Sequence, residues 1–140
     1  MIGVMAPEPS TARSAADLGA SYRAYLACLN ARAWANLDGF VADDVVYNGQ
    51  VVGLAGYRRM LERDTTEVPN LRFDLDLLVV DPPYVAARLV FECTPRGRFL
   101  DLDVNGRRVS FCENVFYRLV GEKIAEVWSV IDKAAIERQL

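Results

Sequence analysis

The sequence contains no histidine among its 140 residues. This absence excludes Ser-His and Cys-His catalytic arrangements, zinc sites built with histidine, and the usual general base near neutral pH. Acid–base chemistry would have to come from carboxylates, tyrosines, a lysine with a shifted pKa, or water held by these groups.

Cysteine is scarce, and Cys28, Cys93 and Cys112 are widely spaced, with neither metal-ligand nor redox spacing. We interpret them as reduced thiols of a cytoplasmic protein, and we predict no metal and no cofactor. The net charge of −3 gives no general attraction for nucleic acid or anionic membranes. No segment is an apolar run long enough to span a membrane, and we expect no signal peptide.

What remains is the composition of a single globular domain, with 52% hydrophobic and 25% charged residues. Pro7, Pro9 and several small residues indicate a flexible lead over residues 1–13. We therefore predict one folded domain over residues 14–140.

Apolar residues at helical spacing predict a first helix over residues 15–31. A short second helix is expected over residues 34–41. A third begins near Gly53 and turns Tyr57, Met60 and Leu61 inward.

The pattern changes to period two after Pro69. Residues 71–80 alternate through Leu71, Phe73, Leu75 and Leu77, and residues 84–93 form a second long strand. A strand pair follows over residues 111–132, and a short early strand ends at the turn signal Asn48-Gly49. Helices segregated from a mostly antiparallel sheet predict an α+β fold. A strongly curved sheet around the helices would leave a cone with an apolar interior, suited to small molecules.

Five segments in this order resemble the SnoaL-like polyketide cyclase family, which has the nuclear transport factor 2-like fold. They are "ADDVVYNG", "GLAGYRRML", "VPNLRFDLD", "NGRRVSFCENVFYRL" and "GEKIAEVWSVID", with "ERQL" at the end. The resemblance implies a cone-shaped barrel, a homodimer, a deep pocket between sheet and helices, and cofactor-free cyclase chemistry. It also implies a catalytic carboxylate at position 129 and a histidine partner at position 115. Here these positions are Ser129 and Val115, so the family pair is absent.

The strand pair offers a different set of polar groups. If Val115 faces Ser129, alternation places Glu113, Val115, Tyr117, Val127, Ser129 and Ile131 on one face. The resemblance implies that this face lines the pocket. A carboxyl in a dry, apolar setting has its pKa raised by desolvation, which suits Glu113 to proton transfer near neutral pH.

The candidate catalytic residues are Glu113, Tyr47, Tyr117, Ser129 and Asp132. The candidate substrate-binding residues are Tyr25, Leu29, Met60, Leu89, Phe91, Val115, Val127 and Ile131. Structural roles stay open for each group: Glu113 could pair with Arg107 or Arg108, the tyrosines could be core aromatics, and Asp132 suits the N-cap of a closing helix.

Two main functions follow. The first is a cofactor-free cyclase or isomerase acting on a small hydrophobic polyketide-type or other secondary metabolite. The alternative is a non-catalytic binding or carrier protein that has lost the family pair. A third interpretation, a dimerisation module, predicts no usable cavity. On the opposite strand face, Phe116, Trp128 and Val130 predict a homodimer formed through the outer face of the sheet.

Overall fold

The computed structural model describes residues 14–140, so the predicted lead over residues 1–13 lies outside the described residues. The helices are α1 (Ala15–Asn30), the 3-10 helix η1 (Trp34–Gly39), α2 (Gly53–Glu67) and α3 (Lys133–Glu137). The strands are β1 (Val41–Tyr47), β2 (Gln50–Val51), β3 (Asp74–Asp81), β4 (Tyr84–Cys93), β5 (Arg98–Phe99), β6 (Leu102–Asp103), β7 (Val109–Val120) and β8 (Lys123–Ile131).

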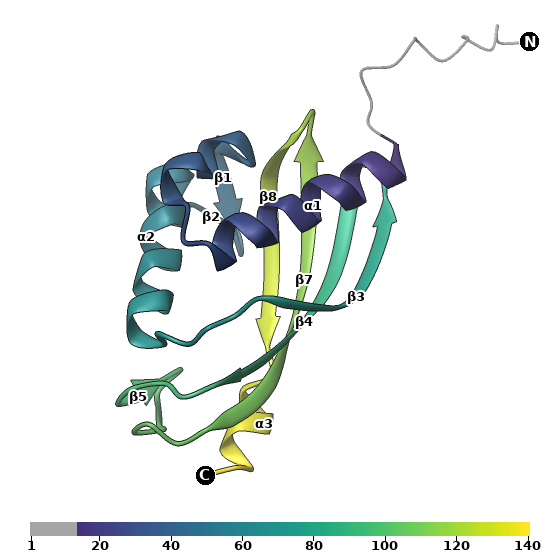
Figure 1. Cartoon of the computed structure of the whole chain (residues 1–140). Coiled ribbons are helices and arrows are strands. Elements are labelled where there is room, and N and C mark those ends of the chain that lie inside the picture. Colours follow the sequence, from purple (N-terminus) through teal and green to yellow (C-terminus); the bar gives the residue numbers. More distant parts are fainter. Residues whose placement is uncertain (1–13) are drawn as a thin grey trace, which may run out of the picture.

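The main sheet has six strands in the order β2-β1-β8-β7-β4-β3. The four long strands pair antiparallel in chain order, whereas β1 runs parallel to β8. Figure 1 shows a curved sheet with α1 and α2 on the same side of it. The predicted α+β class is confirmed. Of the described helices, none combines the length and the apolar composition needed to cross a membrane.

Helix α1 begins where its sequence supplies a capping box. The Ser14 hydroxyl accepts a hydrogen bond from the Asp17 amide (3.0 Å), and the Asp17 carboxylate accepts one from the Ser14 amide (3.4 Å). The side chains that follow at helical spacing are buried, among them Leu18, Tyr22 and Tyr25. The start of the helix and its inward face therefore both follow from local sequence.

The register of β7 and β8 is the predicted one. Val115 pairs with Ser129, and the flanking pairs place Glu113 opposite Ile131 and Tyr117 opposite Val127. The apolar members of this face are deeply buried; Val115 and Val127 are almost inaccessible. A one-residue slip would turn this whole set outward, so burial fixes the register.

Two predicted boundaries were wrong. The strand expected from Leu71 begins at Asp74, because the Asn30 side chain binds both backbone groups of Phe73, at 2.7 and 3.1 Å. The helix expected to reach Val41 ends at Gly39. There the Phe40 carbonyl accepts a hydrogen bond from the Ile124 amide (2.8 Å), which draws the chain into the sheet.

The strict alternation read through Leu77 was also wrong. The β3–β4 register shifts between Leu75 and Leu77, because β3 has one more residue than β4 between these two pairs. Leu77 consequently points outward and is 58% exposed, while Leu78 packs against the core.

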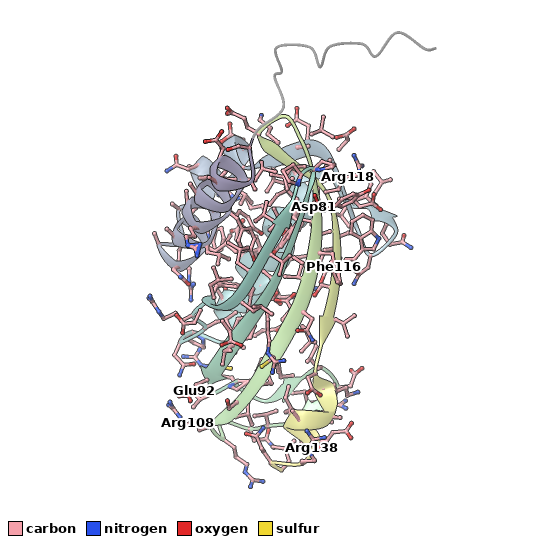
Figure 2. The ribbon with its side chains drawn as sticks, turned by 90° about the vertical axis from the view of Figure 1, so that its right-hand side faces the viewer. Asp81, Glu92, Arg108, Phe116, Arg118 and Arg138 are labelled. Atoms are coloured by element: carbon pink, nitrogen blue, oxygen red, sulfur yellow. The ribbon has the colours of Figure 1, made fainter. Side chains whose placement is uncertain are left out.

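The outer face of the sheet carries exposed apolar side chains across several strands. Phe116 on β7 pairs with Trp128 on β8, and they are 56% and 37% exposed; Val130 and Leu77 extend the same patch. Figure 2 shows Phe116 near the middle of this face, between labelled charged residues at both ends of the sheet. The predicted apolar outer face is therefore present, and the shift at Leu77 makes it wider.

Candidate functional site

A cavity of about 110 Å³ lies between the inner face of the sheet and helices α1 and α2. All eight predicted substrate-binding residues line it: Tyr25, Leu29, Met60, Leu89, Phe91, Val115, Val127 and Ile131. Its wall is mostly apolar and carries only a few polar groups, which is the usual composition of a small-molecule site. The dimerisation-only interpretation expected no such cavity.

Glu113 is the carboxyl that β7 turns toward the cavity. The Ser129 hydroxyl donates a hydrogen bond to Glu113 Oε2 from the neighbouring strand. Burial raises the pKa of Glu113, the Ser129 hydrogen bond lowers it, and the charge of Asp64 raises it again. The result is a carboxyl with a raised pKa that still has one donor to stabilise its ionised form.

The arginines that could have neutralised Glu113 have other partners. Arg108 pairs with Glu92 at 2.7 Å, and Arg107 donates to the backbone carbonyl of Leu140 at 3.2 Å. The only hydrogen-bond partner of the Glu113 carboxylate among residues 14–140 is Ser129. Glu113 is therefore a cavity group and not a member of the surface ion pairs.

Tyr47, at the end of β1, also lines the cavity beside Glu113. Its ring meets that of Tyr57 edge to face, with centroids 6.1 Å apart. Burial raises the pKa of the Tyr47 phenol, a hydrogen bond with Ser129 opposes this, and the charge of Glu113 reinforces it. The phenol therefore stays protonated and can donate a hydrogen bond to a ligand oxygen.

Asn48 fixes the relative positions of β1 and β8 at the site. Its side-chain oxygen accepts from the Ser129 amide (2.8 Å), and its side-chain nitrogen donates to the Ser129 carbonyl (3.2 Å). Its backbone has a φ of +46°, in the left-handed region that asparagine tolerates. The predicted turn residue thus also holds the backbone that carries the Ser129 hydroxyl.

The other three tyrosines that line the cavity are hydrogen-bonded, two to each other and one to Tyr22, which lies outside the lining. The hydroxyls of Tyr25 and Tyr57 lie 2.7 Å apart, and those of Tyr22 and Tyr117 lie 3.0 Å apart. Burial strongly raises the pKa of all four phenols, so they remain neutral. Tyr117 lines the cavity as predicted, but its hydroxyl is engaged with Tyr22.

Two candidate catalytic residues lie at the edge of this arrangement. Ser129 is not among the cavity-lining residues and reaches the site through Glu113. Asp132 is exposed and accepts a hydrogen bond from the Ala135 amide (3.1 Å), so it caps α3 and lies outside the lining.

Asp64 is a second cavity carboxyl, which the sequence analysis did not predict. It lies on α2, three residues after Leu61 and seven after Tyr57, and all three line the cavity. Burial raises the pKa of Asp64 to about 6, Arg63 opposes this and Glu67 adds to it. The same helical spacing that identified Tyr57 and Leu61 as inward would have identified Asp64.

Four phenylalanine rings form one apolar part of the cavity wall. Phe91 stacks on Phe111 with centroids 5.2 Å apart, and Phe73 and Phe99 contact this pair. Phe99 belongs to the small β5–β6 hairpin, whose tip contributes Leu100 to the lining. Within residues 14–140 there is no group of three or more metal-binding side chains.

The model of the family described as SnoaL-like polyketide cyclase matches residues 20–140. This chain belongs to the SnoaL-like polyketide cyclase family. A SnoaL-like polyketide cyclase from Agrobacterium tumefaciens is 54% identical, with a TM-score of 0.86 over 87% of this chain and 96% of that one.

Two further solved structures show the same SnoaL-like fold. TsrD from Streptomyces laurentii is 25% identical, with a TM-score of 0.80 over 91% of this chain and 96% of that one. IdmH from Streptomyces antibioticus is 17% identical, with a TM-score of 0.76 over 87% and 96%. No curated protein matches the chain. The predicted family and fold are confirmed.

Proposed function

We propose that this SnoaL-like protein is a cytoplasmic, cofactor-free cyclase or isomerase. Its substrate would be a small hydrophobic metabolite of the polyketide type, or a related secondary metabolite. The observation that carries the proposal is the placement of Glu113 in an apolar cavity, with a raised pKa and a hydrogen bond from Ser129. Family membership supports cyclase-type chemistry.

Glu113 would act as the general base. In its ionised form it removes a proton from a carbon next to a carbonyl group, and the Ser129 hydroxyl stabilises the carboxylate before transfer. The neutral Tyr47 phenol is a donor for the oxygen on which negative charge develops. Asn48 keeps Ser129 in place.

The apolar walls would select and orient the substrate. An aromatic or aliphatic body fits against Phe91 and Phe111, which leaves an oxygen-bearing end for Glu113 and Tyr47. Holding one conformer with the reacting atoms close together lowers the entropic part of the barrier.

The direct test is hydrogen–deuterium exchange at the α-carbon of phenylacetone in deuterium oxide, followed by proton NMR. Phenylacetone has an aromatic body and an enolisable carbonyl, so it probes the chemistry without the natural substrate. Glu113→Gln should lower the enzyme-dependent rate about 100-fold, whereas Tyr47→Phe should lower it by a smaller factor. Glu92→Gln is the matched control, because its carboxylate is exposed and pairs with Arg108. Unimpaired exchange in both cavity variants would refute the assigned roles.

A binding or carrier protein is the second candidate function. It is favoured by the residues at the two positions of the family pair, Ser129 and Val115, neither of which is an acid or a base. Under this alternative phenylacetone would raise the melting temperature, yet wild-type exchange would not exceed that of buffer.

We also propose that the protein is a homodimer formed through the outer face of the sheet. Phe116, Trp128 and Val130 form an exposed apolar patch, and symmetry would let two copies of it meet. The Arg118–Glu126 pair, at 3.5 Å, lies on the same strands and would form part of a polar rim.

A further inference from the structure

We propose that Asp64 is the second proton-transfer group of this site, acting across the cavity from Glu113 as the acid that protonates the substrate oxygen. The inference rests on the proposed function and deepens it. It gives the site two carboxyls with different roles in place of a carboxylate and a histidine.

The first support is geometric. Asp64 comes from α2, whereas Glu113 comes from β7, and both line the same cavity. Their charges interact directly, because the Asp64 carboxylate raises the pKa of Glu113 and of Tyr47. A ligand in the cavity would therefore lie between a carboxyl on the helix layer and a carboxyl on the sheet.

The second support is that Asp64 has no structural task. Among residues 14–140, no hydrogen bond or ion pair is made by its carboxylate, although the neighbouring Glu62 pairs with Arg58 at 2.7 Å. Its backbone carbonyl accepts from the Val68 amide (2.9 Å), but any residue could do this. A carboxyl turned into an apolar cavity costs stability, so its placement points to a role with the ligand.

The two carboxyls have environments that separate their protonation states. Glu113 receives a hydrogen bond from Ser129, which favours its ionised form. Asp64 has no such donor; burial raises its pKa, Arg63 lowers it, and the charge of Glu67 on the same helix raises it again. When the two carboxyls share one proton, the Ser129 donor favours the form in which Glu113 is ionised and Asp64 carries the proton.

This arrangement balances a proton-transfer reaction without any further reactant. Glu113 takes the α-proton, the electron pair of the broken C–H bond becomes the C=C bond of the enol, and Asp64 gives its proton to the carbonyl oxygen. Where the substrate carries a C=C bond next to the α-carbon, the enol is a dienol; Glu113 then returns the proton to the γ-carbon, the enol O–H returns its proton to Asp64, and the double bond has moved. In a ring closure, the enol carbon instead attacks a second carbonyl within the substrate. The enol O–H returns its proton to Asp64 as the C=O bond re-forms, and the new alkoxide takes the proton held by Glu113, so both carboxyls are restored.

The experiment combines phenylacetone exchange with a carboxyl titration by carbon NMR. Asp64→Asn keeps the shape of the side chain but cannot donate a carboxylic proton, so the exchange rate should fall about 100-fold. The same variant should lower the apparent pKa of Glu113, because it removes a facing negative charge. Glu62→Gln, on the same helix and outside the cavity, should change neither quantity.

The outcomes separate the two claims. Wild-type exchange that is lost in Glu113→Gln but retained in Asp64→Asn overturns the role of Asp64 and leaves the proposed function intact. Wild-type exchange no faster than that of buffer overturns the proposed function itself. An Asp64→Asn variant with slow exchange and an unchanged Glu113 titration would also overturn the role, since the two carboxyls would then not face a common ligand.

Discussion

Asp64→Asn should make the protein more stable at neutral and alkaline pH, although it is expected to slow the reaction. In the folded protein burial raises the pKa of Asp64 from 3.8 to about 6. A shift of about two pKa units corresponds to about 3 kcal/mol of unfavourable ionisation once the carboxyl is fully charged. An asparagine carries no charge and avoids this cost.

The sign of the effect follows from proton binding. Between about pH 4 and pH 6 the folded state holds the Asp64 proton more tightly than the unfolded state, so the free energy of unfolding falls as pH rises. The free energy of unfolding of Asp64→Asn should therefore exceed that of wild type by less than about 1 kcal/mol at pH 4 and by about 2–3 kcal/mol at pH 8. Removing the charge of Asp64 also lowers the raised pKa of Glu113, which adds to the gain at alkaline pH, whereas the remaining carboxylates contribute equally to wild type and variant.

Urea unfolding of both proteins at the two pH values measures this difference. Glu62→Gln is the control, because it removes an exposed ion pair and should cost no more than about 0.5 kcal/mol. An advantage of Asp64→Asn that is absent at pH 8, or equal at both pH values, would show that the Asp64 carboxylate is well solvated. The two-carboxyl account would then lose its physical basis.

Three further predictions concern the support of the site and the outer face. Asn48→Gly retains the left-handed backbone but removes both side-chain hydrogen bonds to the Ser129 backbone. It should reduce the rate of phenylacetone exchange about tenfold and lower the free energy of unfolding in urea by only about 1–2 kcal/mol. An exchange rate equal to that of wild type would show that Asn48 does not position Ser129. Tyr57→Phe should cost about 1–2 kcal/mol by leaving the Tyr25 hydroxyl unpaired, and the double variant Tyr25→Phe/Tyr57→Phe should cost less than the sum of the two singles in a double-mutant cycle; additive costs would refute the paired hydroxyls. Trp128→Glu should convert dimers to monomers or to aggregates in light scattering, and a wild type that is monomeric at high micromolar concentration would refute the dimer.

The inner face of β7 and β8 could be predicted from sequence because strand alternation is a local rule. Once Val115 was placed opposite Ser129, the positions of Glu113 and Tyr117 followed. The cavity-lining residues from α1 could be predicted for the same reason, since helical spacing fixed Tyr25 on the inward face.

Other features depend on contacts between distant residues. The Asn48 amide meets Ser129, 81 positions further along the chain, and no local pattern indicates that meeting. The register shift beside Leu77 depends on how β4 aligns, which alternation within β3 does not reveal.

Asp64 is a different case, because its position could have been predicted. The helical spacing that places Tyr57 and Leu61 inward extends to position 64. An acidic residue on a helix with many charged side chains is usually solvated, so a carboxyl at that position is easily assigned to the surface. The cavity shows that this stretch of α2 lines the space between the helices and the sheet.

A crystal structure of the protein with bound phenylacetone would show how a ketone lies against Glu113. We expect the phenyl ring to pack beside Phe91 and Phe111, with the α-carbon within about 3–3.5 Å of Glu113 and the carbonyl oxygen turned toward Tyr47 and Asp64. Phenylacetone bound outside the cavity, or inside it with its carbonyl turned toward the phenylalanines and away from Glu113, would contradict the account.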